Sequence, residues 1–200
     1  QSNHRNRSRL IAFPFLFFIF FLIEIYSHLF ITEMVSHNSN DLKETTENDI
    51  YHVDLSVKIY SSKTTGVACV NTSKTVHSGC AVDPKLKKRI KKDLLITSSL
   101  KESCAQVYAI LTFKLVDHLL RQNHSIKKLV ICNDEQFSYV RLYLQNLLAE
   151  RNIQITNISD YRKMFGRKVG SLADNLANVY RRRALKPNRK GKKLNVVPVS

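Results

Sequence analysis

Four of the ten carboxylates between residues 50 and 200 occupy positions from which they could bind a metal ion. They are Asp54, Glu102, Asp134 and Asp174. Asp54 lies inside a β-branched and aromatic segment, residues 51–57, although aspartate is depleted in strands and a buried, unpaired carboxylate is costly. A metal ion or a cluster of hydrogen-bond donors would offset that cost. Asp54 is therefore the strongest single indication of a site.

Each of the four also has a local structural explanation. The segments that end at Glu102 and Asp174 match the capping box, in which a serine is followed three residues later by an acid. Asp134 follows an apolar strand and could cap the next helix, and Asp54 could face solvent on a half-exposed strand. Taken together, however, the four fall at a strand centre, a strand end and two helix starts. That order would bring them to one edge of a sheet.

The elements that must position these residues follow from the hydrophobic pattern. Strands are predicted at 50–60, 66–71, 75–82, 129–132 and 153–158, and amphipathic helices from 100 for some twenty residues, near 137–148, and from about 172 to Pro187. Asp83-Pro84 resembles a helix N-cap before a basic run, and 159–170 is predicted to be a basic loop. The order β-β-β-α-β-α-β-α predicts an α/β fold with a five-stranded mixed sheet and helices on its faces.

Over residues 50–183 this arrangement resembles the ribonuclease H-like superfamily. That superfamily has an Asp in the middle of strand one, a Glu early in the first long helix, an Asp ending strand four, and an Asp opening the final helix before x-Leu-Ala. These positions are matched in order by Asp54, Glu102, Asp134 and Asp174. The sequence departs from the family where Leu55 replaces the common glycine after the first Asp. It also has no histidine in the loop 159–170.

The resemblance implies that all four carboxylates are catalytic and bind metal. Two Mg²⁺ (or Mn²⁺) ions held ~4 Å apart would activate a water and stabilise the leaving 3′-oxygen. The protein would then be a metal-dependent endonuclease, with the RNA of RNA–DNA hybrids as the substrate suggested by analogy. Without metal, repulsion among the carboxylates should raise their pKa values.

The charge of the chain is concentrated after residue 49. Residues 1–49 hold four basic and six acidic groups, which leaves 28 basic and ten acidic groups in residues 50–200, a net charge of +18 there. Such a basic domain predicts a polyanion partner, either nucleic acid or an anionic membrane surface. The residues expected to contact nucleic-acid phosphates are Lys58, Arg162, Lys163, Arg167, Lys168, Arg181 and Arg182.

Two other functions remain open from the sequence. The first is a non-catalytic RNA-binding or ribosome-associated protein on the same fold, with the basic tail contacting rRNA. The carboxylates separate this alternative from a nuclease, because a pure RNA binder has no reason to gather four negative charges. The second is a membrane-anchored interaction protein whose basic face lies on lipid headgroups.

The chain is predicted to divide into a hydrophobic segment at 1–33, a polar linker at 34–49, the domain at 50–186 and a basic tail at 187–200. Residues 10–31 are apolar enough for a transmembrane helix. A membrane anchor and a dispensable leader both remain open, so the expected location is cytoplasmic or, alternatively, membrane-anchored. The four cysteines have no zinc-ligand spacing and are expected to be reduced core residues, although a Cys69–Cys80 disulfide stays open.

Overall fold

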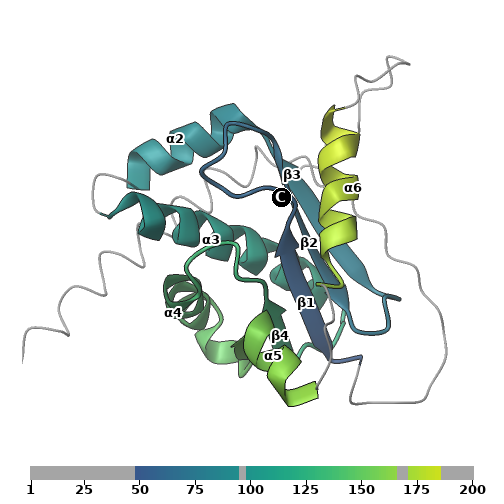
Figure 1. The fold of residues 1–200 in the computed structure, drawn as a ribbon. Helices are drawn as coiled ribbons and strands as arrows, with labels where there is room; N and C mark the ends of the chain where they lie inside the picture. The colour runs from purple at the N-terminus through teal and green to yellow at the C-terminus, as the bar shows by residue number, and fades with distance from the viewer. Residues whose placement is uncertain (1–47, 95–97, 166–170, 186–200) are drawn as a thin grey trace, which may run out of the picture. The chain divides into compact units, whose positions relative to one another are not determined.

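The computed structural model describes residues 48–94, 98–165 and 171–185, and its centre is a five-stranded mixed sheet (Figure 1). The strands are β1 (Ile50–Leu55), β2 (Thr65–Asn71), β3 (His77–Val82), β4 (Lys128–Ile131) and β5 (Gln154–Asn157). Their order is β3-β2-β1-β4-β5, with β1 antiparallel to β2 and parallel to β4. The predicted mixed sheet is confirmed, and the strand that carries Asp54 is its central strand.

The described residues also form six helical segments. They are α2 (Pro84–Leu94), α3 (Leu100–Arg121), α4 (Phe137–Leu147), a 3-10 turn (Ala149–Arg151), α5 (Ile158–Phe165) and α6 (Asp174–Leu185). Helix α2 begins as its sequence predicts, because the Asp83 carboxylate accepts hydrogen bonds from the backbone N–H groups of Lys85 and Leu86.

The prediction of a loop from residue 159 was wrong for its first half. Residues 158–165 form α5, whose start is capped by Asn157: its side-chain oxygen accepts from the Asp160 N–H at 2.7 Å, and its side-chain amide donates to the Asp160 carboxylate. Asn157, the last residue of the short strand β5, was the sequence signal for this helix, because asparagine is a favoured N-cap residue. Residues 166–170, the second half of the predicted loop, lie outside the described residues.

The helices cover both faces of the sheet (Figure 1). Helix α6 packs on β2 and β3 through a buried cluster of Ala68, Val70, Ala173, Ala177 and Tyr180. Side chains alternate along a strand, and Asp54 pairs directly with Ala68 across β1 and β2. Asp54 therefore points to the face that α6 covers, while α3 packs on the opposite face.

Two glycines allow α6 to approach the sheet closely. A Cβ at Gly66 would collide with the backbone carbonyl of Ala177, and a Cβ at Gly79 would collide with the ring of Tyr180. The close approach fixes where the first turn of α6 lies relative to the end of β1. Neither glycine had an evident role in the sequence.

The four cysteines are free and buried, as the sequence predicted. Cys69 lies opposite Ser78 and Cys80 lies opposite Val67, so the two are not a directly opposed pair and form no disulfide. They act as small core residues of the sheet.

Within the described ranges, no helix is both long and apolar enough to cross a membrane. The predicted anchor at 10–31 and the predicted tail at 187–200 lie outside these ranges.

Substitution of Gly66 by alanine tests the close packing of α6. The added methyl group meets backbone rather than a movable side chain, so we expect the free energy of unfolding to fall by about 1–3 kcal/mol in urea titrations. The exposed Ser62→Ala should change it by less than about 0.5 kcal/mol. An equally small effect for Gly66→Ala would contradict the packing described here.

Candidate metal centre

The candidate site lies where β1 and β4 end. Because these two strands are parallel and adjacent, their carboxyl ends meet at one edge of the sheet, the edge where open α/β sheets place ligands. Asp54 is the last residue but one of β1, and Asp134 follows shortly after β4. The N–H of Cys132 donates to the carbonyl of Val53 at 3.1 Å, which holds the two chain segments together beyond the strand pairing.

Three potential ligand atoms converge at this edge. One carboxylate oxygen each from Asp54 and Asp134 and the sulfur of Cys132 all lie within 4.8 Å of one another. Asp54 and Cys132 are buried and Asp134 is half-buried. Two of the four predicted carboxylates are thus brought together, with a thiol that the sequence had not indicated as part of the site.

Asp54 is only 5% exposed and is surrounded by hydrogen-bonding groups. Its Oδ1 accepts from the N–H of Leu55 at 2.7 Å, and Cys132 and Ser171 are further hydrogen-bonding neighbours of the carboxyl group. A hydrogen bond between Asp54 and Asp134 requires a proton shared by the two carboxyl groups. Burial raises the pKa of Asp54 to about 6, and Asp134 acts in the same direction through its hydrogen bond and its charge. The donors Cys132 and Ser171 oppose the rise. A cation beside Asp54 would relieve this unfavourable burial of charge.

The Cys132 thiol donates a hydrogen bond to Asp134 in this arrangement. Burial raises the pKa of its thiol, and the charges of Asp54 and Asp134 raise it further, so the sulfur is protonated. The thiol donates to Asp134 Oδ2 at 3.1 Å. The carboxylates of Asp54 and Asp134 offer a cation oxygen ligands of the kind that Mg²⁺ and Mn²⁺ prefer.

Helix α3 reaches the site through Tyr108. Its hydroxyl donates to the carbonyl of Val53 at 3.2 Å and lies 3.5 Å from the sulfur of Cys132. The tyrosine is fully buried, and burial raises the pKa of its hydroxyl well above the ordinary value. Tyr108 stays neutral and fixes the ends of β1 and β4 against α3. The sequence showed it only as one member of an apolar helix face.

Glu102 does not belong to the converging group. Its backbone N–H donates to Ser99 Oγ at 3.3 Å, as the capping box predicts for the serine. Its carboxylate, however, accepts from the hydroxyl of Tyr143 on α4 at 2.5 Å, and the same hydroxyl accepts from the Gln106 amide at 2.7 Å. Glu102 therefore connects α3 with α4 as the structure stands.

Asp174 is also outside the group. It is exposed at the first position of α6, and its Oδ1 accepts from the Asn178 side chain at 3.2 Å within the same helix. The residue near the start of α6 that contacts Asp54 is Ser171. The helix start therefore contributes a hydroxyl group to the site where a carboxylate was predicted.

The capping explanation of Asp134 is wrong. Helix α4 begins at Phe137, and its N-cap residue is Gln136, whose side chain makes no capping hydrogen bond. The neighbouring Glu135 accepts from the N–H of Ile59 at 2.8 Å and so holds the loop that follows β1. Asp134 is left to interact with Cys132 and Asp54, which strengthens its interpretation as a ligand.

The residues predicted to bind nucleic acid are spread over several elements. Lys58 is exposed in the loop after β1, with Nζ 5.9 Å from the ring centroid of Tyr60. Lys163 is exposed on α5 and pairs with Asp160 at 3.7 Å. Arg162 belongs to α5, while Arg181 and Arg182 lie near the end of α6, half-buried and exposed respectively, and Arg167 and Lys168 lie outside the described residues.

Comparison of the chain with protein-family models, with curated proteins and with solved structures finds no significant match. The interpretation of the site therefore depends on the geometry and chemistry of its own residues.

Substitution of Asp54 by asparagine tests its burial through the pH dependence of stability. The folded-state pKa of Asp54 is raised from 3.8 to about 6, so its stabilising contribution is present below pH 3.8 and is lost as pH rises through 6. The neighbouring His52 has the opposite effect on the pH dependence of stability. Burial lowers the pKa of His52 from 6.5 to about 4, so its stabilising contribution is present above pH 6.5 and is lost as pH falls through 4. Asp54→Asn removes only the first effect.

We expect Asp54→Asn to stabilise the metal-free protein more at pH 7 than at pH 4. The stability change caused by Asp54→Asn should be larger at pH 7 than at pH 4 by roughly 2.4 kcal/mol, which is most of the linkage expected from the raised pKa. Urea titrations at both pH values in EDTA measure this, with the exposed Glu150→Gln as a control. The same stability change at both pH values would show that the Asp54 carboxyl group is not held in a desolvating environment.

Proposed function

We propose that this protein is a metal-dependent nuclease of the ribonuclease H-like type that hydrolyses phosphodiester bonds in nucleic acid. The observation that carries the proposal is the burial of Asp54 beside Asp134 at the carboxyl edge of two parallel strands. Two adjacent carboxylates, one of them 5% exposed, are unfavourable for folding when both are ionised, unless a cation binds them. A purely structural role would not require this pairing.

The fold supports the proposal. A five-stranded mixed sheet with Asp54 in its first strand agrees with what the resemblance implies. Two short helices, α2 and α5, are additional to the order of elements derived from the sequence. The high net charge of residues 50–200 supports a polyanion substrate. RNA in an RNA–DNA hybrid is the substrate proposed by analogy with the family.

Asp54 and Asp134 would hold a Mg²⁺ or Mn²⁺ ion between their carboxylates. When bound, such an ion stabilises negative charge on phosphate oxygens and lowers the pKa of a coordinated water. The other residues position the ligands. Ser171 and the N–H of Leu55 orient Asp54, the Cys132 thiol orients Asp134, and Tyr108 fixes the ends of the strands.

A second ion would need ligands that are engaged elsewhere. Glu102 would have to give up its hydrogen bond with the hydroxyl of Tyr143 to bind the ion, and Asp174 would have to give up its hydrogen bond with the amide of Asn178. Both partners are neutral, so the exchange breaks no ion pair. We propose these exchanges as the way in which the chain would complete a two-ion site with all four carboxylates.

The second candidate function is a non-catalytic RNA-binding protein on the same fold. It is favoured by the observation that Glu102 and Asp174 make hydrogen bonds within the protein, so that two carboxylates converge where four were predicted. The basic surface serves either function equally. Activity, rather than binding, separates the two.

The variant Asp134→Asn tests the proposed nuclease. Asparagine keeps an oxygen that can accept from the Cys132 thiol, and no helix cap is lost, so the fold should be retained. Removal of the charge takes away a cation ligand, so cleavage should fall by several orders of magnitude, roughly 10³-fold or more, while affinity for nucleic acid is kept or increased.

Cleavage should be measured with Mg²⁺ and with Mn²⁺ on an RNA–DNA hybrid, duplex RNA, single strands and branched DNA. Glu150→Gln, which removes one exposed carboxylate, is the control and should cleave like the parent. If Asp134→Asn also cleaves like the parent, Asp134 is structural. If the parent protein cleaves none of these substrates, the RNA-binding function is the better account.

A further inference from the structure

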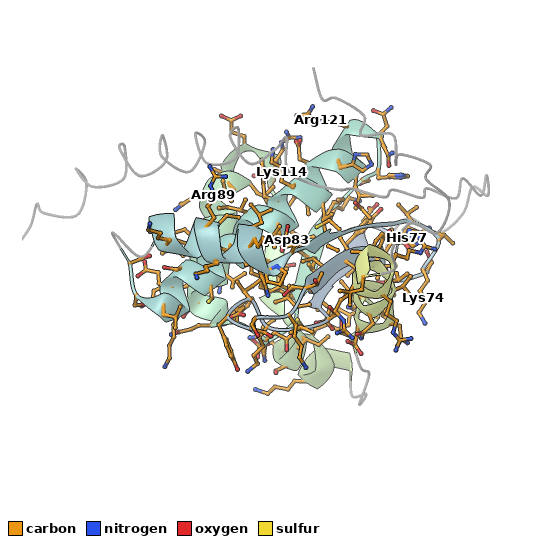
Figure 2. The ribbon with its side chains drawn as sticks, turned by 90° about the horizontal axis from the view of Figure 1, so that it is seen from above. Lys74, His77, Asp83, Arg89, Lys114 and Arg121 are labelled. Atoms are coloured by element: carbon orange, nitrogen blue, oxygen red, sulfur yellow. The ribbon has the colours of Figure 1, made fainter. Side chains whose placement is uncertain are left out.

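Helix α2 carries a one-sided basic surface. Its residues Leu86, Lys87 and Ile90 are buried, whereas the opposite side of the helix is exposed. The exposed side carries four cationic residues at helical spacing, a set we call the α2 stripe: Lys85, Lys88, Arg89 and Lys92. The stripe is roughly 10 Å long, from the rise of 1.5 Å per residue. Figure 2 labels Arg89 on this helix and Asp83 at its start.

The acid at the start of α2 serves as the cap of the helix. The carboxylate of Asp83 is engaged as the helix cap, accepting from two backbone N–H groups of the first turn. The first turn of the helix itself contains no acidic residue. A run of cations with helical spacing on one exposed face is suited to the regularly spaced phosphates of a nucleic-acid backbone.

A buried lysine attaches the loop between β1 and β2 to this helix. Lys87 is 1% exposed, and its ammonium group donates to the carbonyls of Ser61 and Lys63 and to the hydroxyl of Thr65 at 2.6–2.7 Å. A buried ammonium is tolerated only when its donors are satisfied, and three oxygens satisfy them here. The loop therefore lies alongside α2 in a defined position (Figure 1).

The attached loop presents an aromatic ring beside cations. Tyr60 is 58% exposed, although Ile59 next to it is fully buried and held through Glu135. Lys58 lies over the ring of Tyr60 at 5.9 Å, and Lys63 is exposed on the same loop. Exposed aromatic rings flanked by cations are the platform on which unpaired bases stack, because every base has an aromatic face.

We propose that single-stranded nucleic acid docks on both the α2 stripe and the Tyr60 loop, which Lys87 attaches to the other side of the same helix. The phosphates lie along the stripe, and an unpaired base stacks on Tyr60. A duplex can engage only the stripe, because its base faces are already stacked. Charge complementarity and the exposed aromatic ring together favour this occupant over other polyanions.

The surface adjoins the candidate metal centre. The loop begins directly after β1, which carries Asp54, and it is held by Glu135, the residue after Asp134. The inference rests on the proposed function in one respect: a strand bound here would be led toward the two carboxylates. The binding itself does not depend on metal.

The stripe is tested by measuring how tightly the full chain binds labelled oligonucleotides across a salt series in EDTA. The ligands are 12-nucleotide oligo-dT, 12-nucleotide oligo-U and a 12-base-pair duplex. The test variant is K85Q/K88Q/K92Q, and the control with the same charge change is K101Q/K127Q/R141Q, on exposed positions outside α2. Affinity falls as salt rises, so the slope of log affinity against log salt is negative. Loss of three phosphate contacts should make this slope shallower by about two for single strands. The control should leave that slope unchanged.

Substitution of Tyr60 tests the stacking platform independently of charge. Tyr60→Leu should weaken single-strand binding roughly 5- to 150-fold, with the salt slope unchanged and duplex binding unaffected, whereas Tyr60→Phe should bind like the parent. Tyr60→Leu binding like the parent, or a slope made shallower to the same extent by both triple variants, would overturn the proposal.

A membrane-surface role gives a different outcome, which would also overturn the proposal. In that case K85Q/K88Q/K92Q would lose binding to phosphatidylserine vesicles and keep its affinity for oligonucleotides. Because all these measurements are made without metal, their failure leaves the candidate metal centre intact. Failure of the Asp134→Asn cleavage test leaves the docking surface intact in turn.

Discussion

The desolvation of one carboxylate in the central strand shapes the site and its surroundings. Asp54 lies at the end of β1 on the face that α6 covers, and it shares that position with Asp134 because β1 and β4 run in parallel. The chain surrounds the pair with neutral donors, a serine hydroxyl, a thiol and a backbone N–H. These donors reduce the cost of the charge without neutralising it, since burial still raises the pKa of Asp54 to about 6. The remaining electrostatic cost is what a divalent cation would offset.

The rest of the fold holds this edge of the sheet from three directions. Helix α3 holds it through the hydroxyl of Tyr108 on the carbonyl of Val53. The start of α6 holds this edge through Ser171, and the contact of α6 with Gly66 sets how closely that helix packs on the sheet. The loop after β1 is fixed between Glu135 and the buried ammonium of Lys87. The same contacts that position Asp54 therefore also position the exposed ring of Tyr60 and the α2 stripe.

Strong local patterns in the sequence predicted the sheet, the long helices and the two residues that converge. Asp54 was evident because an acid inside a β-branched strand needs compensation, and Asp134 because it follows a wholly apolar strand. Glu102 and Asp174 lie at helix starts, where side-chain direction changes by about 100° per residue. Helix α6 begins at Asp174 rather than near residue 172, and Ser171 makes the contact with Asp54. The partners of Glu102 and Lys87 come from distant segments, so tertiary packing alone determines them.

Paramagnetic NMR with Mn²⁺ tests the central claim most directly, namely that Asp54 and Asp134 together bind a divalent cation. Amide signals of the full chain are recorded as Mn²⁺ is added in small substoichiometric steps, because the ion broadens signals from nuclei close to it. We expect the amides of Leu55, Cys132 and Asp134 to broaden first, and this early broadening to disappear in Asp54→Asn. Early broadening centred on other carboxylates, or broadening that Asp54→Asn leaves unchanged, would contradict a cation site at the carboxyl edge of β1 and β4.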